Sequence, residues 1–123
     1  MVQVGRVNEY VDILLGIQVT GDRAIHMGMT NIQHMVNSHP DDYATYGKDI
    51  PIILASPDYV GLNPKDGSIE YVKEYVVKGE HVKVAVRLSG NGVFFARSIY
   101  VLNPQRVASF VKKGTLKKIP KSK

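Results

Sequence analysis

Three consecutive segments with the periodicity of β-strands constrain the fold of this chain more than any other feature. They are residues 68–77 ("SIEYVKEYVV"), 81–89 ("HVKVAVRLS") and 92–102 ("GVFFARSIYVL"). All three are rich in Val, Ile, Tyr and Phe, and the sequences "KG" and "SGNG" between them are typical of turns. The sequence therefore predicts an antiparallel β-meander.

Helical patterns lie on both sides of this meander. Apolar residues at helical spacing predict short helices over residues 9–17 and 31–39, and "DIPIILASP" (residues 49–57) predicts another helix or a buried turn. Thr30 is a suitable N-cap for the second helix, and Pro40 should end it at or before His39. "RAIHMG" (residues 23–28) predicts a short strand, and "NPQRVASFVKKG" (residues 103–114) a closing helix. We predict an α+β fold in which short N-terminal helices pack on the meander, followed by a C-terminal helix and a basic tail.

The composition indicates one folded domain. The 123 residues suffice for one core, which we assign to residues 1–114, with a tail at residues 115–123. No stretch approaches the ~18 apolar residues of a membrane span. Because the first residues lack the pattern of an export signal, a cytoplasmic protein is expected. The absence of cysteine excludes thiolate catalysis and cysteine-based zinc sites.

The positive charge is concentrated at the C-terminus. The formal net charge is +5, but "KKGTLKKIPKSK", from Lys112 onward, holds six lysines and no acid, so the rest of the chain is nearly neutral. Such a tail could bind a phosphate backbone or could simply be a solvated terminus.

The turn signals also suggest a register for the meander. A two-residue turn at Lys78-Gly79 places Lys73 opposite Val84, and a turn at Gly90-Asn91 places Arg97 opposite Val84 as well. One face would then be apolar with two cations side by side, and it comprises Tyr71, Lys73, Tyr75, Val82, Val84, Val86, Phe95, Arg97 and Ile99. The other face would be exposed to water and carry two cross-strand ion pairs, Glu74 with Lys83 and Glu70 with Arg87.

His34 and His39 in "IQHMVNSHPDDY" are the first candidates for chemistry, since the chain has only four histidines. A metal site is disfavoured, because five residues turn the second side chain roughly 140° around a helix. Both could be structural, His34 as a polar residue of an amphipathic helix and His39 as a cation near the negative helix end. The alternative is acid–base catalysis, for which imidazole has a suitable pKa.

Cleavage of RNA without a metal requires few other groups. A base removes the 2′-hydroxyl proton, an acid protonates the leaving 5′-oxygen, and cations stabilise the transition state. Lys73 and Arg97 could supply the cations, and Ser98 or Tyr100 a hydroxyl donor. The chain contains no G-x-x-x-x-G-K-[ST], G-x-G-x-x-G or G-x-S-x-G motif, so nucleotide hydrolysis and serine hydrolysis lose their usual support.

The order of these features resembles that of a known superfamily. "VGRV" and a short helix, "AIHMGMTNIQHMVNSHP", "IPIILASPDYV" and the strands "VKVAVRL" and "GVFFARSIYVLN" resemble the phage-associated nuclease domains of the barnase/EndoU/colicin E5–D/RelE superfamily over residues 2–114. The resemblance implies helices packed on an antiparallel sheet and a metal-independent endoribonuclease without cofactors.

The resemblance also implies a biological setting and a set of site residues. The protein would be a toxin or effector of a phage or mobile element, with tRNA or mRNA as substrate and an immunity or antitoxin protein as partner. The site residues it implies are His34, His39, Lys73, Arg97, Ser98 and Tyr100. The alternatives are a non-catalytic nucleic-acid-binding or protein-binding module on the same scaffold and a toxin-like domain acting on a protein or nucleotide.

Overall fold

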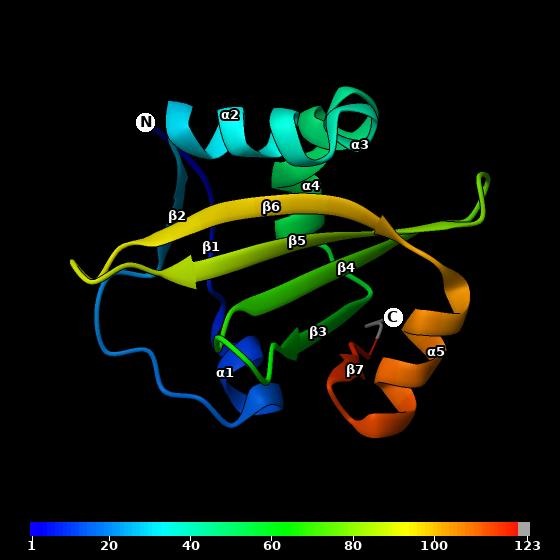
Figure 1. Ribbon diagram of the computed structural model, residues 1–123. Helices are drawn as coiled ribbons and strands as arrows, with labels where there is room; N and C mark the ends of the chain where they lie inside the picture. The colour runs from blue at the N-terminus through cyan, green and yellow to red at the C-terminus, as the bar shows by residue number, and fades with distance from the viewer. Residues whose placement is uncertain (121–123) are drawn as a thin grey trace.

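The computed structural model describes residues 1–120 and contains one mixed sheet with helices on both faces (Figure 1). In the described residues the sheet has seven strands in the order β1-β2-β6-β5-β4-β3-β7. The strands are β1 (Val2–Arg6), β2 (Ala24–Met27), β3 (Tyr59–Leu62), β4 (Ile69–Tyr75), β5 (Glu80–Leu88), β6 (Phe94–Leu102) and β7 (Leu116–Lys118). The helices are α1 (Glu9–Leu15), α2 (Met29–Ser38), α3 (Pro40–Tyr46), the 3₁₀ turn η1 (Gly47–Asp49), α4 (Ile50–Ala55) and α5 (Pro104–Lys113).

The predicted meander forms the centre of the sheet. β4 pairs antiparallel with β5, and β5 with β6. The predicted strand at residues 23–28 is β2, which pairs antiparallel with β1 and runs parallel to the start of β6. The sequence did not indicate β1 or the parallel pairing. The fold is therefore α+β, with a sheet wider than the meander.

The β4–β5 turn is longer than predicted. It comprises residues 76–79, and the Gly79 amide donates to the Val76 carbonyl at 3.1 Å. Tyr75 therefore pairs with Glu80, and Lys73 with Val82 instead of Val84. Because the register is shifted by two residues, each β4 side chain still lies on its predicted face.

A β-bulge in β6 places Arg97 on the face opposite to the predicted one. Ala85 pairs with Ser98, but Val86 pairs with Ala96, so Arg97 is the extra residue. One extra residue exchanges the two faces of the strand beyond it. Phe95 and Arg97 consequently leave the apolar face, where Ala96 takes their place as a fully buried residue.

The helical segments differ from the prediction mainly at their starts. α2 begins at Met29, and Gly28 is its N-cap in place of Thr30, because the Asn31 Oδ1 atom accepts from the Gly28 amide at 2.9 Å. The helix ends at Ser38, as predicted. Pro40 then begins a new helix, α3, which the sequence did not indicate. Proline suits this position because the first helical residue needs no amide donor.

Two apolar clusters lie on opposite faces of the sheet. The larger one packs α1, α2 and α4 against the face that carries Val82, Val84 and Val86. The smaller cluster lies on the opposite face, where Val107 of α5 packs near Val72. α5 therefore covers one end of a face that was predicted to be exposed.

The predicted basic tail begins with a strand. Leu116 is buried, and β7 pairs antiparallel with β3. Gly61 permits this pairing, because a Cβ atom there would lie 1.9 Å from the Thr115 carbonyl oxygen. The last part of the predicted tail, residues 121–123, lies outside the described residues. Within residues 1–120 no helix has the length and apolar character needed to cross a membrane.

Candidate functional site

The candidate site lies on the sheet face opposite the main core, between α2 and α5. Side chains of β5 and β6 alternate, so Ala85, Arg87, Ser98 and Tyr100 point away from the buried Val84 and Ile99. In Figure 1, α4 lies behind the strands, whereas α2 runs above β6 and α5 stands at the end of the sheet. We call this sheet face the open face, because its middle is left uncovered.

His34 and Arg97 line the same cleft on the open face. The cleft has a volume of about 180 Å³, and its polar lining residues are His34, Asp66, Ser68, Arg87, Arg97 and Ser98. A neighbouring pocket of about 210 Å³ shares both arginines and extends to Asn31 and Phe95. The structure thus brings together three of the six predicted site residues, His34, Arg97 and Ser98.

The charge balance of this cleft is positive. Arg87 and Arg97 are exposed, and within residues 1–120 no carboxylate lies within ion-pair distance of either guanidinium. Hydrogen bonds from the Ser68 backbone and hydroxyl hold the pKa of the Asp66 carboxyl below its usual value, and the two arginines lower it further. Asp66 is therefore ionised at neutral pH, and two cations face one anion. Such a cleft favours an anionic ligand.

His39 and Tyr100 form a second contact on the open face. Their ring centroids are 5.0 Å apart and the ring planes differ by 22°. The Asp42 carboxylate of α3 accepts a hydrogen bond from the Val101 amide at 3.1 Å, which fixes α3 against β6 beside this stack. Since Ser98 and Tyr100 are two residues apart on one strand, the stack adjoins the His34 cleft.

A buried ion pair lies beside Tyr100 on the open face. The Lys83 ammonium lies 2.8 Å from the Glu70 carboxylate and 4.6 Å from the centroid of the Tyr100 ring. Burial alone would lower the pKa of Lys83, but hydrogen bonds with Glu70 and Tyr100 outweigh burial and raise it. The predicted ion pairs are wrong: Glu74 lies 3.8 Å from His81, and Glu70 pairs with Lys83 instead of Arg87. Because Glu70 and Lys83 lie diagonally across two strands, they become partners only once the register is known.

Lys73 lies apart from the other predicted residues. Its ammonium donates to the Ser56 carbonyl at 3.0 Å, on the face that α4 covers. The bulge at Arg97 places that guanidinium on the opposite face. The predicted pair of adjacent cations therefore does not form. Arg87, which the sequence analysis had assigned to an ion pair, is the second cation beside Arg97.

Neither histidine belongs to a cluster of metal ligands. In the part of the chain that the structure describes, no group of three His, Cys, Asp or Glu side chains is placed to hold a metal ion. His34 lies with guanidinium and hydroxyl groups, and His39 lies with a phenol ring.

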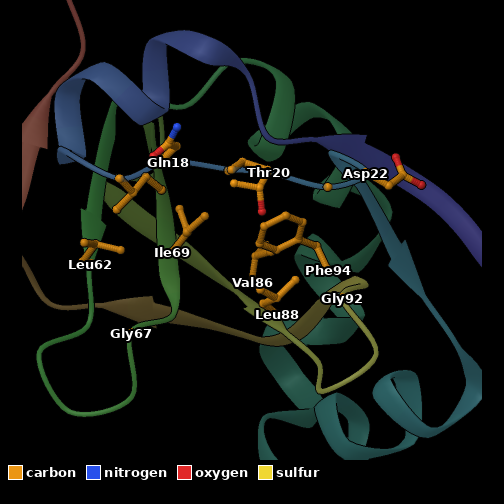
Figure 2. A pocket seen from close by; sticks show the side chains of 13 residues that line it. Gln18, Thr20, Asp22, Leu62, Gly67, Ile69, Val86, Leu88, Gly92 and Phe94 are labelled. Carbon is orange, nitrogen blue, oxygen red and sulfur yellow. The ribbon is translucent and has the colours of Figure 1, made fainter.

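A further pocket, on the core side of the sheet, is apolar. It has a volume of about 280 Å³ and lies under the loop between α1 and β2, with Ile69, Val86 and Phe94 forming its walls (Figure 2). The Thr20 hydroxyl points toward the Phe94 ring, whereas the Asp22 carboxylate points away from the cavity. Among residues 1–120, Asp22 is the one titratable residue of this lining, and because its carboxylate points away the cavity offers no group for acid–base chemistry.

Comparison with protein families identifies the family of this chain. The model of a family described as phage-barnase-EndoU-colicin E5/D-RelE-like nuclease matches residues 2–109. The chain belongs to this family. Comparison with curated proteins and with solved structures gave no match.

The family assignment covers the whole candidate site. The matched residues include most of α5 and every strand except β7. All the side chains of the His34 cleft and of the His39–Tyr100 stack therefore belong to the nuclease domain. A nuclease acts on a phosphodiester, and the open face combines the groups that phosphodiester chemistry uses: imidazoles, guanidinium groups and hydroxyls.

Proposed function

We propose that the protein is a metal-independent endoribonuclease whose active site is the open face of the sheet. The observation that carries this proposal is the single cleft lined by His34, Arg97 and Ser98. An imidazole that can move a proton and a guanidinium that can stabilise a phosphate charge lie there within one small volume. The membership of a nuclease family supports phosphodiester cleavage as the reaction.

The reaction we propose is a transesterification within the RNA strand. One imidazole of the His34–His39 pair removes the proton of the 2′-hydroxyl, and the 2′-oxygen attacks the phosphorus. The bond to the 5′-oxygen breaks, and the second group, an imidazole or the Tyr100 hydroxyl, protonates that oxygen. The products are a 2′,3′-cyclic phosphate and a 5′-hydroxyl.

The cations of the cleft stabilise the transition state in this proposal. Arg87 and Arg97 have no competing carboxylate within ion-pair distance in residues 1–120, so their donors are available to the phosphoryl oxygens. The Ser98 hydroxyl, between Arg97 and Ile99 on β6, adds a neutral donor. Lys73 has no role in this mechanism because it lies on the other face.

The phage-associated description of the family supports a role as a toxin or effector of a phage or mobile element. We propose tRNA or mRNA as the substrate, an immunity or antitoxin protein as the partner, and the cytoplasm, where such RNA is found, as the location.

The test is incubation of the purified protein with total RNA and tRNA in EDTA, followed by analysis of the new 3′ ends. Wild-type protein should produce cyclic-phosphate ends, and at least one of the variants His34→Ala and His39→Ala should lower the rate by at least about 100-fold. Gln33→Ala, at an exposed position beside His34 on α2, is the folding control and should cleave normally. Absence of cleavage by wild type, or cleavage only with added Mg²⁺, would contradict the proposal.

A further inference from the structure

A second basic pocket lies on the open face, on the other side of Tyr100 from the His34 cleft. It has a volume of about 330 Å³ and lies between the β3–β4 loop and α5. Its basic lining residues are Lys65, Lys83, Arg106 and Lys113. Glu70 is its acidic lining residue, and that carboxylate is already paired with Lys83.

Three of the four cations are free to meet a ligand. Lys65, Arg106 and Lys113 are exposed, and among residues 1–120 none of them has a carboxylate within ion-pair distance. The Arg106 guanidinium lies over the Phe110 ring, 5.5 Å from its centroid, which restricts its orientation. Such an arrangement of unpaired cations attracts an anion.

The position of the pocket indicates which anion it would bind. Tyr100 lines this pocket and Ser98 lines the His34 cleft, and the two residues face the same side of β6. Because two residues of a strand span only ~7 Å, the two pockets are neighbours on the open face. A single nucleic acid strand bound with one phosphate at Arg97 can therefore extend to Arg106.

We propose that Lys65, Arg106 and Lys113 form a second phosphate subsite, which binds a phosphate of the RNA strand other than the scissile one. The position relative to the scissile bond rests on the proposed function, whereas the binding of a nucleic acid phosphate does not. Glu70 neutralises the charge of Lys83, so Lys83 contributes to the subsite chiefly through its contact with the Tyr100 ring.

Binding of uncleavable RNA as a function of salt tests the subsite directly. A fluorescent 2′-O-methyl RNA lacks the attacking hydroxyl, so its affinity can be measured by anisotropy whether or not the protein is a nuclease. The double variant Arg106→Ala/Lys113→Ala should bind about 10-fold more weakly at low salt. The slope of log K against log[salt] should fall by about 0.7, the value for one lost phosphate contact with a single strand.

A control of equal charge change separates the subsite from general attraction. Lys48→Ala/Lys78→Ala also removes two exposed cations, but these lie around Tyr46, away from the open face. It should leave the slope unchanged. Equal losses in both double variants, an unchanged slope in the first, or no binding of RNA by wild type would overturn the proposal. Both variants change exposed side chains, and thermal unfolding verifies their fold.

Kinetics distinguish a failure of the subsite from a failure of the proposed function. With a dinucleoside monophosphate, which has one phosphate, Arg106→Ala/Lys113→Ala should have wild-type kcat/KM. With a longer RNA it should raise KM about 10-fold. Salt-dependent binding without any cleavage would support the phosphate subsite and overturn the nuclease proposal. Cleavage with equal effects on both substrates would overturn the subsite alone.

Discussion

The His39 imidazole stacks on the Tyr100 ring at a centroid separation of 5.0 Å and joins the α2–α3 junction to the last strand of the meander. The Lys83 ammonium lies 4.6 Å from the same ring. Tyr100 thus links a helical histidine to the buried ion pair on the same face of the sheet. Its ring has a structural role that can be separated from any role of its hydroxyl.

Substitutions at Tyr100 should separate these two roles. Tyr100→Phe keeps the ring and its stack but loses the hydrogen bond with Lys83, so we expect the free energy of unfolding to fall by about 1.5–3 kcal/mol. RNA cleavage should fall about 10-fold through loss of the hydroxyl donor. Tyr100→Leu also loses the stack, which is worth about 0.5–1.5 kcal/mol. Urea unfolding and the cleavage rate measure the two effects. Wild-type cleavage by Tyr100→Phe would remove the hydroxyl from the proposed mechanism.

The face assignments of Arg97 and Lys73 give a second prediction. Arg97→Ala should lower kcat/KM by about 100-fold, because it removes a cation from the proposed phosphate site. Lys73→Ala should change kcat/KM by less than about 3-fold, because that ammonium lies across the sheet and bonds to the Ser56 carbonyl. Steady-state kinetics with one labelled RNA measure kcat/KM of both variants and of the wild-type protein. Equal losses in the two variants would mean that the bulge does not separate the cations in solution.

Substitution of only one partner of the Glu70–Lys83 pair should lower the stability of the protein substantially. Both residues are buried, with 6% and 5% of their surfaces exposed. Glu70→Gln leaves the ammonium without its counter-ion, and we expect a loss of about 3–5 kcal/mol in the free energy of unfolding. The double variant Glu70→Leu/Lys83→Met removes both charges and should recover most of that loss. Urea unfolding of the three proteins tests this, and a single variant as stable as wild type would contradict it.

Tyr46 should make the protein sensitive to alkaline pH. Burial, together with the hydrogen bond to Glu80, raises the pKa of Tyr46 to about 12. The unfolded chain releases this proton near pH 10, whereas the folded protein retains it to about pH 12. The stability from this group is therefore complete below about pH 10 and is lost between pH 10 and 12.

The variant Tyr46→Phe tests this dependence. Its stability should be lower than that of wild type at pH 8, because Glu80 loses its hydrogen bond, but should fall less steeply above pH 10. Thermal unfolding at a series of pH values gives both slopes. Because the pKa of Tyr75 is also raised by burial and by Asp49, some alkaline dependence should persist in the variant. Parallel curves for the two proteins would contradict the assignment.

Part of the site was predictable because its signals are local. The turn and strand patterns of residues 68–102 predicted the meander, and the stop at Pro40 placed His34 and His39 on either side of a helix end. The predicted register of β4 and β5 was wrong by two residues, but each side chain still lies on its predicted face of the sheet, because strand side chains alternate with a period of two. The sequence motifs also identified the superfamily that the family model then matched.

Long-range pairing decided the rest. A single bulge at Arg97 moved that residue to the open face and away from Lys73, and local periodicity contains no signal for one extra residue. The pairing of β2 with β6 and of β7 with β3, and the diagonal contact of Glu70 with Lys83, depend on segments distant in the chain. The sequence by itself determined the three strands of the meander, β2, the helices α2 and α5, and the reactive side chains that they carry. Only the tertiary structure decided which of them share a cleft, because that depends on packing across the whole sheet.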